Sequence, residues 1–169
     1  MDLEYMIREL RIGLGTIQAL LSEMTQDEAL IRPDPKSWSS LEVLSHLVDE
    51  EREDFRMHIG QIFSSSDKKW HAIDPEGWVL ERQYQAQSLK NKLAEFISER
   101  DKSIHWLQNL RAADWTATIP APFGDISAKS LLAAWADHDN LHMRQLVEIR
   151  HYILSTKCAS ESTRYAGDW

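Results

Sequence analysis

The sequence contains very little cysteine. Cys158 is the single cysteine among 169 residues, so the chain cannot form an internal disulfide. This excludes the disulfide-dependent domains and predicts a reducing compartment, most simply the cytoplasm. The chain also lacks a long apolar run, and its first residues, MDLEYMIREL, carry charge from the second position. We therefore expect neither a signal peptide nor insertion into a membrane.

Basic residues are scarce as well. Lys and Arg number 19 against 27 Asp and Glu, which gives a formal net charge of -8. Phosphate binding needs a clustered basic surface, so a nucleic-acid partner is disfavoured. Gly (6) and Pro (5) are few and hydrophobic residues make up 43%, which is typical of a globular protein. We expect one domain over residues 1–155 and a polar tail, residues 156–169, that either frays or docks through Tyr165 and Trp169.

Two-residue alternation, the mark of half-buried strands, is missing too. Apolar residues instead recur at steps of three and four, which predicts an all-α four-helix bundle. The predicted helices cover about residues 3–21, 39–62, 84–110 and 125–154. The second starts at a capping box formed by Ser39 and Glu42, and either Asp125 or Ser127 caps the fourth. Residues 64–83 form a long crossover, so the second and third helices need not be antiparallel neighbours.

The fourth predicted helix carries two histidines in its apolar seam. His138 and His142 lie four residues apart, so both imidazoles point toward the interior. An unpaired buried ring nitrogen costs about 1–3 kcal/mol, so these rings need partners. One explanation is a divalent transition metal, and the other is bonding to a carboxylate, a carbonyl or water. The spacing alone favours the second, because such pairs are common on helices and a metal needs a third ligand.

Five other histidines are candidates for that third ligand. His105 and His151 fall on the charged faces of their helices and His71 lies in the crossover, so we expect all three to be solvated. His58 lies at the edge of its helix's apolar stripe, without an inward partner pattern. His46 lies roughly opposite the stripe of the same helix, so periodicity does not select it.

Two motifs resemble a known family. The string SWSSLEVLSHLVDEEREDF, residues 37–55, is similar to the second helix of the DinB/YfiT-like superfamily of metalloenzymes, and WADHDNLHMRQL, residues 135–146, is similar to its fourth helix. In outline the resemblance covers nearly the whole chain, including the long link after the second helix. Family members hold a metal with one histidine from the second helix and two from the fourth. The resemblance therefore implies His46, His138 and His142 as ligands. It also implies a homodimer, because members often dimerise.

The resemblance further implies a metal-dependent enzyme with a small-molecule substrate. Three neutral imidazoles leave a cation its full charge and an open coordination position, where it acidifies water or deprotonates a thiol. The superfamily includes thiol transferases and hydrolases. We expect transfer of a low-molecular-weight thiol to a small electrophile. Hydrolysis and a non-catalytic, metal-binding or self-associating bundle are the alternatives. Zinc or nickel is expected, and iron or manganese stays open because histidine sites accept several metals.

Polar residues near these histidines each have two interpretations. Glu50 follows His46 by one turn, where it can orient the ligand or act as a general base, but the charge run DEEREDF favours a solvated side chain. Asp139 falls in the apolar sector of its helix, which predicts an arginine partner. Gln145 can bond a ligand or a neighbouring backbone, and Trp135 is expected to pack the core. The loop PAPFGDIS, residues 120–127, can line a pocket mouth.

Overall fold

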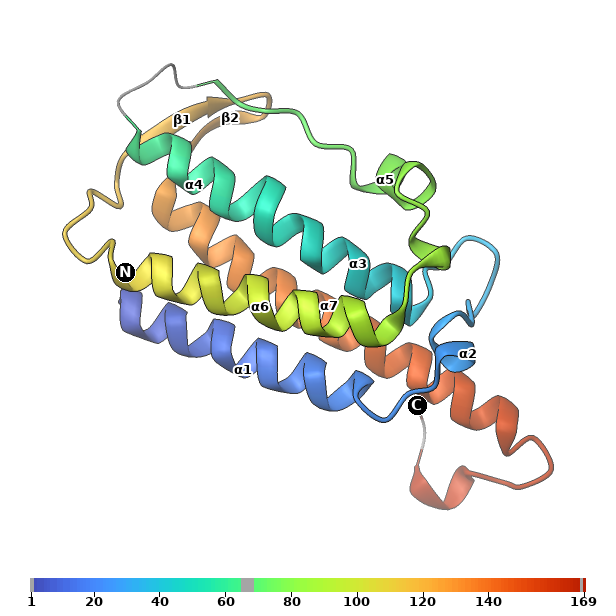
Figure 1. The fold of residues 1–169 in the computed structure, drawn as a ribbon. Helices are drawn as coiled ribbons and strands as arrows, with labels where there is room; N and C mark the ends of the chain where they lie inside the picture. Colours follow the sequence, from blue (N-terminus) through green and yellow to red (C-terminus); the bar gives the residue numbers. More distant parts are fainter. Residues whose placement is uncertain (1, 65–68, 168) are drawn as a thin grey trace.

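In a computed structural model the chain forms four long helical segments (Figure 1). The structure describes residues 2–64, 69–167 and 169. Within these residues the long segments are α1 (Leu3–Leu21), α3 (Ser40–Glu50) continued by the π-helix η1 (Glu51–Phe55) and α4 (Arg56–Phe63), α6 (Leu89–Gln108) and α7 (Ala128–Lys157). The predicted all-α four-helix bundle is confirmed. No helix in the described ranges combines the length and the apolar character that crossing a bilayer requires.

The long crossover follows from the directions of the helices. Figure 1 shows α1 and α7 running one way and α3–α4 and α6 running the other way. α1 packs against α6 and α7, and α3 packs against the same two helices. Because the second and third long segments are parallel neighbours, the chain must travel back along the bundle between them. The crossover contains α5 (Pro75–Glu81) and the 3₁₀ turn η2 (Tyr84–Ala86), and its residues 65–68 lie outside the described part.

Side-chain caps set where the long helices begin. Asp2 accepts hydrogen bonds from the first turn of α1, and the predicted capping box of Ser39 and Glu42 opens α3. Of the two candidates before α7, Ser127 is the cap, accepting from the Ser130 amide. The third long helix begins later than expected, at Leu89, since Tyr84–Ala86 form a separate turn.

A β-hairpin precedes α7 where we predicted a loop. β1 (Thr118–Ala121) pairs antiparallel with β2 (Gly124–Ser127), and Ile119 lies opposite Ile126. Each strand is four residues long and contributes one isoleucine, so its alternation is too short to be recognised in the sequence. Ile119 is fully buried in the bundle core, which fixes the hairpin where α7 begins. The expectation of no strands is wrong at this hairpin.

The remaining short segments lie at the ends of the bundle. α2 (Gln26–Ala29) follows α1, and the 3₁₀ turn η3 (Arg164–Ala166) follows α7. The Trp169 ring stacks on His151 at a centroid distance of 4.1 Å, whereas Tyr165 is fully exposed. The tail thus contacts α7 through one of the two predicted aromatic residues.

A layer of buried polar groups divides the core across the middle of the bundle. One apolar cluster reaches Leu10 on α1 and Ala136 on α7, and the other begins at Ile17 on α1 and Leu146 on α7. Between them lie charged, imidazole and small residues: Gly13, Glu50, Glu51, Asp54, Arg100, His138, Asp139 and His142. Groups that must be paired are therefore concentrated at one level of the fold.

Gly13 permits the close approach of α1 to α7 at this level. A Cβ atom on residue 13 would overlap the carboxylate of Asp139, with Asp139 Cγ only 2.9 Å away. Arg100 holds that carboxylate in place through two hydrogen bonds, so Asp139 cannot move aside. Gly15, two residues later, has open space around the same position.

We predict that Gly13→Ala lowers the free energy of unfolding by about 1–3 kcal/mol, because the added methyl overpacks a rigid polar contact. Gly15→Ala is the matched control and should raise it by about 0.5–1 kcal/mol, through helix propensity alone. Urea denaturation followed by circular dichroism measures both. Equal midpoints for the two variants would contradict the prediction.

Candidate metal centre

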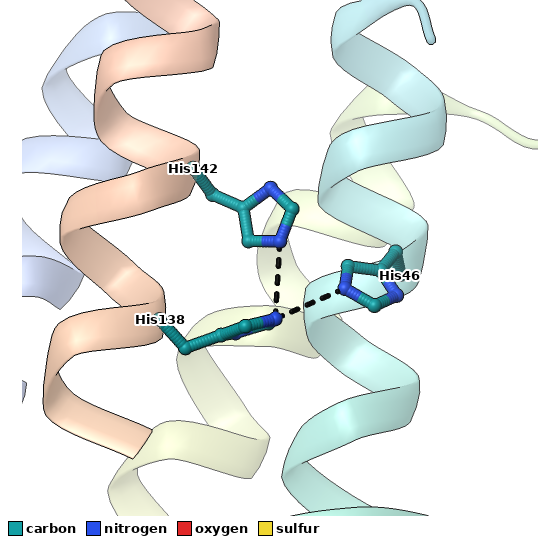
Figure 2. A group of neighbouring side chains, drawn as sticks. All are labelled: His46, His138 and His142. Atoms are coloured by element: carbon teal, nitrogen blue, oxygen red, sulfur yellow. Dashed lines mark hydrogen bonds between the residues drawn. The ribbon is translucent and has the colours of Figure 1, made fainter. Parts of the chain in front are cut away.

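Three histidines from two helices, two of them in the polar layer, converge on one point. Figure 2 shows His46 on α3 facing His138 and His142, which lie one turn apart on α7. The Nε2 atom of His138 is 3.2 Å from Nε2 of His46 and 3.1 Å from Nε2 of His142. One ligand atom from each of the three residues lies within 4.8 Å of the others. The structure thus brings together the three ligands that the sequence resemblance implied.

Hydrogen bonding cannot satisfy this arrangement. A ring nitrogen offers one in-plane donor or acceptor direction, so Nε2 of His138 cannot bond well to both neighbours at once. A tetrahedral cation with metal–nitrogen bonds of 2.0–2.1 Å separates its ligand nitrogens by roughly 3.3 Å, close to the distances found here. The donor set and its spacing therefore fit a divalent transition metal.

Burial keeps the three imidazoles in the form that binds metal. His46 is buried, and His138 and His142 are partly buried. Burial and the charges of His142 and His138 lower the pKa of His46 to about 2. Burial, with His142 adding to it, likewise lowers the pKa of His138 to about 3. Burial also lowers the pKa of His142, although Gln145 acts in the opposite direction. Neutral rings leave a lone pair for a cation.

The second ring nitrogens of two ligands face oxygen atoms. His142 Nδ1 lies 2.9 Å from Gln145 Oε1, so Nδ1 carries the proton and donates it, which leaves Nε2 unprotonated. His46 Nδ1 lies 3.7 Å from Glu50 Oε1, and neither atom has a hydrogen-bond partner among the described residues. Gln145 therefore bonds His142, one of the three candidate ligands, which agrees with the first of its two predicted roles.

Glu50 is buried, with an exposed fraction of 4%, so the interpretation of a solvated charge run is wrong for it. Burial, together with a hydrogen bond and repulsion from Asp54, raises the pKa of Glu50 to about 9. Burial and the neighbouring Asp54 carboxyl group therefore favour the protonated form of Glu50. Glu50 is the last residue of α3, one turn after His46, and α3 is buried on all sides, so the position of Glu50 on this helix accounts for its burial.

Comparison with known proteins places the chain in a family. The family model described as DinB superfamily matches residues 9–146, a span that includes all three converging histidines. The chain belongs to the DinB superfamily. A solved structure with a similar fold, described as "YfiT from Bacillus subtilis is a probable metal-dependent hydrolase with an unusual four-helix bundle topology", has a TM-score of 0.78 at 14% identity, covering 90% of this chain and 87% of that chain. No curated protein matches the chain.

Aromatic rings surround the converging histidines of this DinB-superfamily chain. Trp38 lies 5.0 Å from the His46 ring and parallel to the His142 ring at 6.5 Å. Phe55 meets His138 edge-on at 5.3 Å and stacks on Trp135 at 5.5 Å. Apolar periodicity places Phe55 on the main stripe of its helix, but it did not select Trp38, which lies before that helix and inside the family-like string of residues 37–55.

The buried carboxylate of Asp139 has the predicted arginine partner. Arg100, from α6, donates to both Asp139 oxygens at 2.5 and 2.8 Å and to Glu51 Oε1 at 2.7 Å. Trp135 is buried as predicted and donates from its indole nitrogen to Glu51 at 2.9 Å. Asp139 and Trp135 are therefore parts of the core that supports the converging histidines.

The other histidines divide into exposed and buried residues. His105 is exposed as predicted, and so is the side chain of His71. His151 is half-buried under Trp169, so its predicted solvation is only partial. The interpretation of His58 as lacking an inward partner is wrong: it is fully buried, with Nδ1 2.7 Å from Asp54 Oδ1. Asp54 lies one turn before His58, and this spacing was the sequence signal for the pair.

We predict that Arg100→Met lowers the free energy of unfolding by about 3–5 kcal/mol, because it leaves two buried carboxylates unpaired. The control is Arg111→Met, which removes an exposed ion pair with Glu4 and should change stability little. Chemical denaturation at pH 7 measures the difference. An Arg100→Met protein that unfolds at the wild-type midpoint would show that the network does not depend on this cation.

Proposed function

We propose that this chain is a metal-dependent hydrolase whose divalent cation is held by His46, His138 and His142. The convergence of three Nε2 atoms at separations of 3.1 and 3.2 Å carries this proposal. The neighbour with the same fold supports it, since that protein is described as a probable metal-dependent hydrolase. Zinc and nickel fit a site of three imidazoles, and iron and manganese stay open.

A cation held by three neutral imidazoles keeps its full charge and an open position, so it acidifies water and polarises a carbonyl or phosphoryl oxygen. The chain's own residues prepare the site. Burial keeps the imidazoles neutral. Gln145 fixes which nitrogen of His142 is free, and Trp38 covers the His46 and His142 rings.

Glu50 lies next to His46, on the side of the ring opposite the proposed metal position. Its Oε1 atom faces Nδ1 of that ring, on the side away from the converging Nε2 atoms. This placement favours a role in orienting His46 over a role as general base. Oε1 has no hydrogen-bond partner among the described residues, so it is available to accept from the ring N–H.

An open hollow next to the histidines suits a small molecule. It has a volume of about 560 Å³ and is lined by Lys36, Ser37, Trp38, Glu76 and Gln145. Trp38 and Gln145 also contact the histidines, so the hollow and the proposed metal site share a wall. This geometry supports a small-molecule substrate. The homodimer stays a prediction from the family resemblance.

Thiol transfer, which the sequence analysis favoured, gains no support from the comparisons. It remains the alternative chemistry for the same site, and a non-catalytic metal-binding bundle is the other alternative. The two experiments below separate these functions, because they measure metal binding and turnover independently.

We predict that wild-type protein purified without a metal-binding tag holds one divalent cation per chain. His46→Ala and His138→Ala should each lower the affinity about 100-fold or more, because two imidazoles remain. His105→Ala is the control, since that ring is exposed on α6 and should leave binding unchanged. Elemental analysis and competition with a chromogenic chelator measure the effect. Wild-type protein that stays empty in metal-replete medium would refute the site.

We predict metal-dependent hydrolysis of activated esters, amides or phosphoesters by the loaded protein. His138→Ala should slow turnover at least about 100-fold, and chelation should abolish it until metal is restored. The same preparations are tested with small thiols and an electrophile. Thiol consumption without hydrolysis would assign transfer, and turnover that survives chelation would contradict a metal-dependent reaction. Metal binding without either activity would favour the non-catalytic bundle.

A further inference from the structure

Four polar residues form a ladder along one helix, at intervals of four residues. His46, Glu50, Asp54 and His58 succeed one another over α3, η1 and α4. His46 Nδ1 lies 3.7 Å from Glu50 Oε1, the carboxyl groups of Glu50 and Asp54 interact one turn further along, and Asp54 Oδ1 lies 2.7 Å from His58 Nδ1. The ladder connects a proposed metal ligand to an imidazole three helical steps away.

The π-helical turn keeps these four groups on one side of the helix. In an α-helix a step of four residues overshoots a full turn by about 40°, so three steps drift by roughly 120°. A π-turn has more residues per turn and therefore takes back part of this drift. Glu51–Phe55 lie where the ladder passes from Glu50 to Asp54. The π-helical turn thus helps to align the ladder.

The far end of the ladder is rigid. His58 is fully buried, and its Nε2 lies 3.0 Å from the backbone oxygen of His71 in the crossover. A carbonyl oxygen only accepts, so Nε2 carries a proton and donates it. The ring also stacks on Trp70 of the crossover at 3.9 Å. With both nitrogens bonded and one face covered, His58 has a single orientation and holds Asp54 in place.

We propose that His58 is a positioning residue of the metal centre: through Asp54 and Glu50 it sets the orientation of His46, and through His71 it ties this ligand to the crossover. The inference rests on the proposed metal-binding function. A carboxylate that bonds the second nitrogen of a ligand histidine typically changes metal affinity about 10- to 100-fold, and His58 acts one step further out.

A merely structural role is the competing explanation, in which His58 only anchors the crossover to α4. The two ring nitrogens distinguish the roles, because Nδ1 faces Asp54 and Nε2 faces the crossover. An asparagine amide takes the place of Nδ1, and a glutamine amide takes the place of Nε2. His58→Asn therefore keeps the donor to Asp54, and His58→Gln keeps the donor to His71.

The experiment measures Co²⁺ affinity and the visible spectrum of the Co²⁺-loaded full-length protein. We expect His58→Gln to weaken binding about 10-fold or more and to shift the absorption bands, because Asp54 and Glu50 lose their support. His58→Asn should stay within about 3-fold of wild type with unchanged bands. His71→Ala is the matched control, since only its backbone oxygen takes part and its side chain is exposed.

Each result of this experiment either supports or overturns the inference. A His58→Gln protein with wild-type affinity and spectrum overturns the inference and leaves the proposed metal site standing. An Asn variant as impaired as the Gln variant also overturns it, because the loss would then follow from packing and not from the bond to Asp54. Wild-type protein that binds no Co²⁺ overturns the proposed function, and this inference with it.

A second measurement needs no variant and so does not depend on folding. Histidine ring ¹⁵N and N–H resonances are recorded while Zn²⁺ is added to the wild-type protein. We expect the His58 resonances to shift along with those of His46, and the His105 resonances to stay unchanged. A His58 signal that does not respond to Zn²⁺ would refute the coupling.

Discussion

The buried ion pairs of Arg100 constrain the rest of the structure. A guanidinium in the middle of a helical bundle is tolerated only if carboxylates neutralise it and fill its donors. Asp139 from α7 and Glu51 from η1 do so, and the Leu10 carbonyl on α1 takes a further donor at 3.0 Å. One side chain of α6 therefore fixes the rotation of the three other long helices.

The rotation of these helices about their axes also sets the direction in which the candidate metal ligands point. His138 directly precedes Asp139, and Glu50 directly precedes Glu51. When α7 turns Asp139 toward Arg100, the neighbouring His138 is turned toward α3, where His46 lies. The histidines need such external support, because three unprotonated nitrogens pointing at one another do not attract. The charged network thus supplies the stability that the site itself lacks in the absence of a cation.

The sequence predicted the helices more completely than the site. Apolar periodicity gave the bundle, its caps and the inward direction of His138 and His142, because these depend on local spacing. It passed over His46, which lies off the main stripe, and only the family-like motif selected it. The burial of Glu50 was misjudged, because the charge run in which it lies gives no sign that α3 is covered on every side. The hairpin was missed because four-residue strands are too short to show a recognisable alternation. Asp139 was correctly interpreted, since a lone carboxylate in an apolar sector requires a cation.

The topology explains why the crossover can take part in the site. In a bundle whose neighbouring helices alternate in direction, short loops join the ends and no loop passes over the middle. Here α3–α4 and α6 are parallel, so the returning chain runs along the outside of α3–α4 (Figure 1). The contacts of His58 with Trp70 and His71 are the points at which this returning chain is fastened. A site placed halfway along the bundle can then be influenced by a segment that, in a simpler topology, would never approach it.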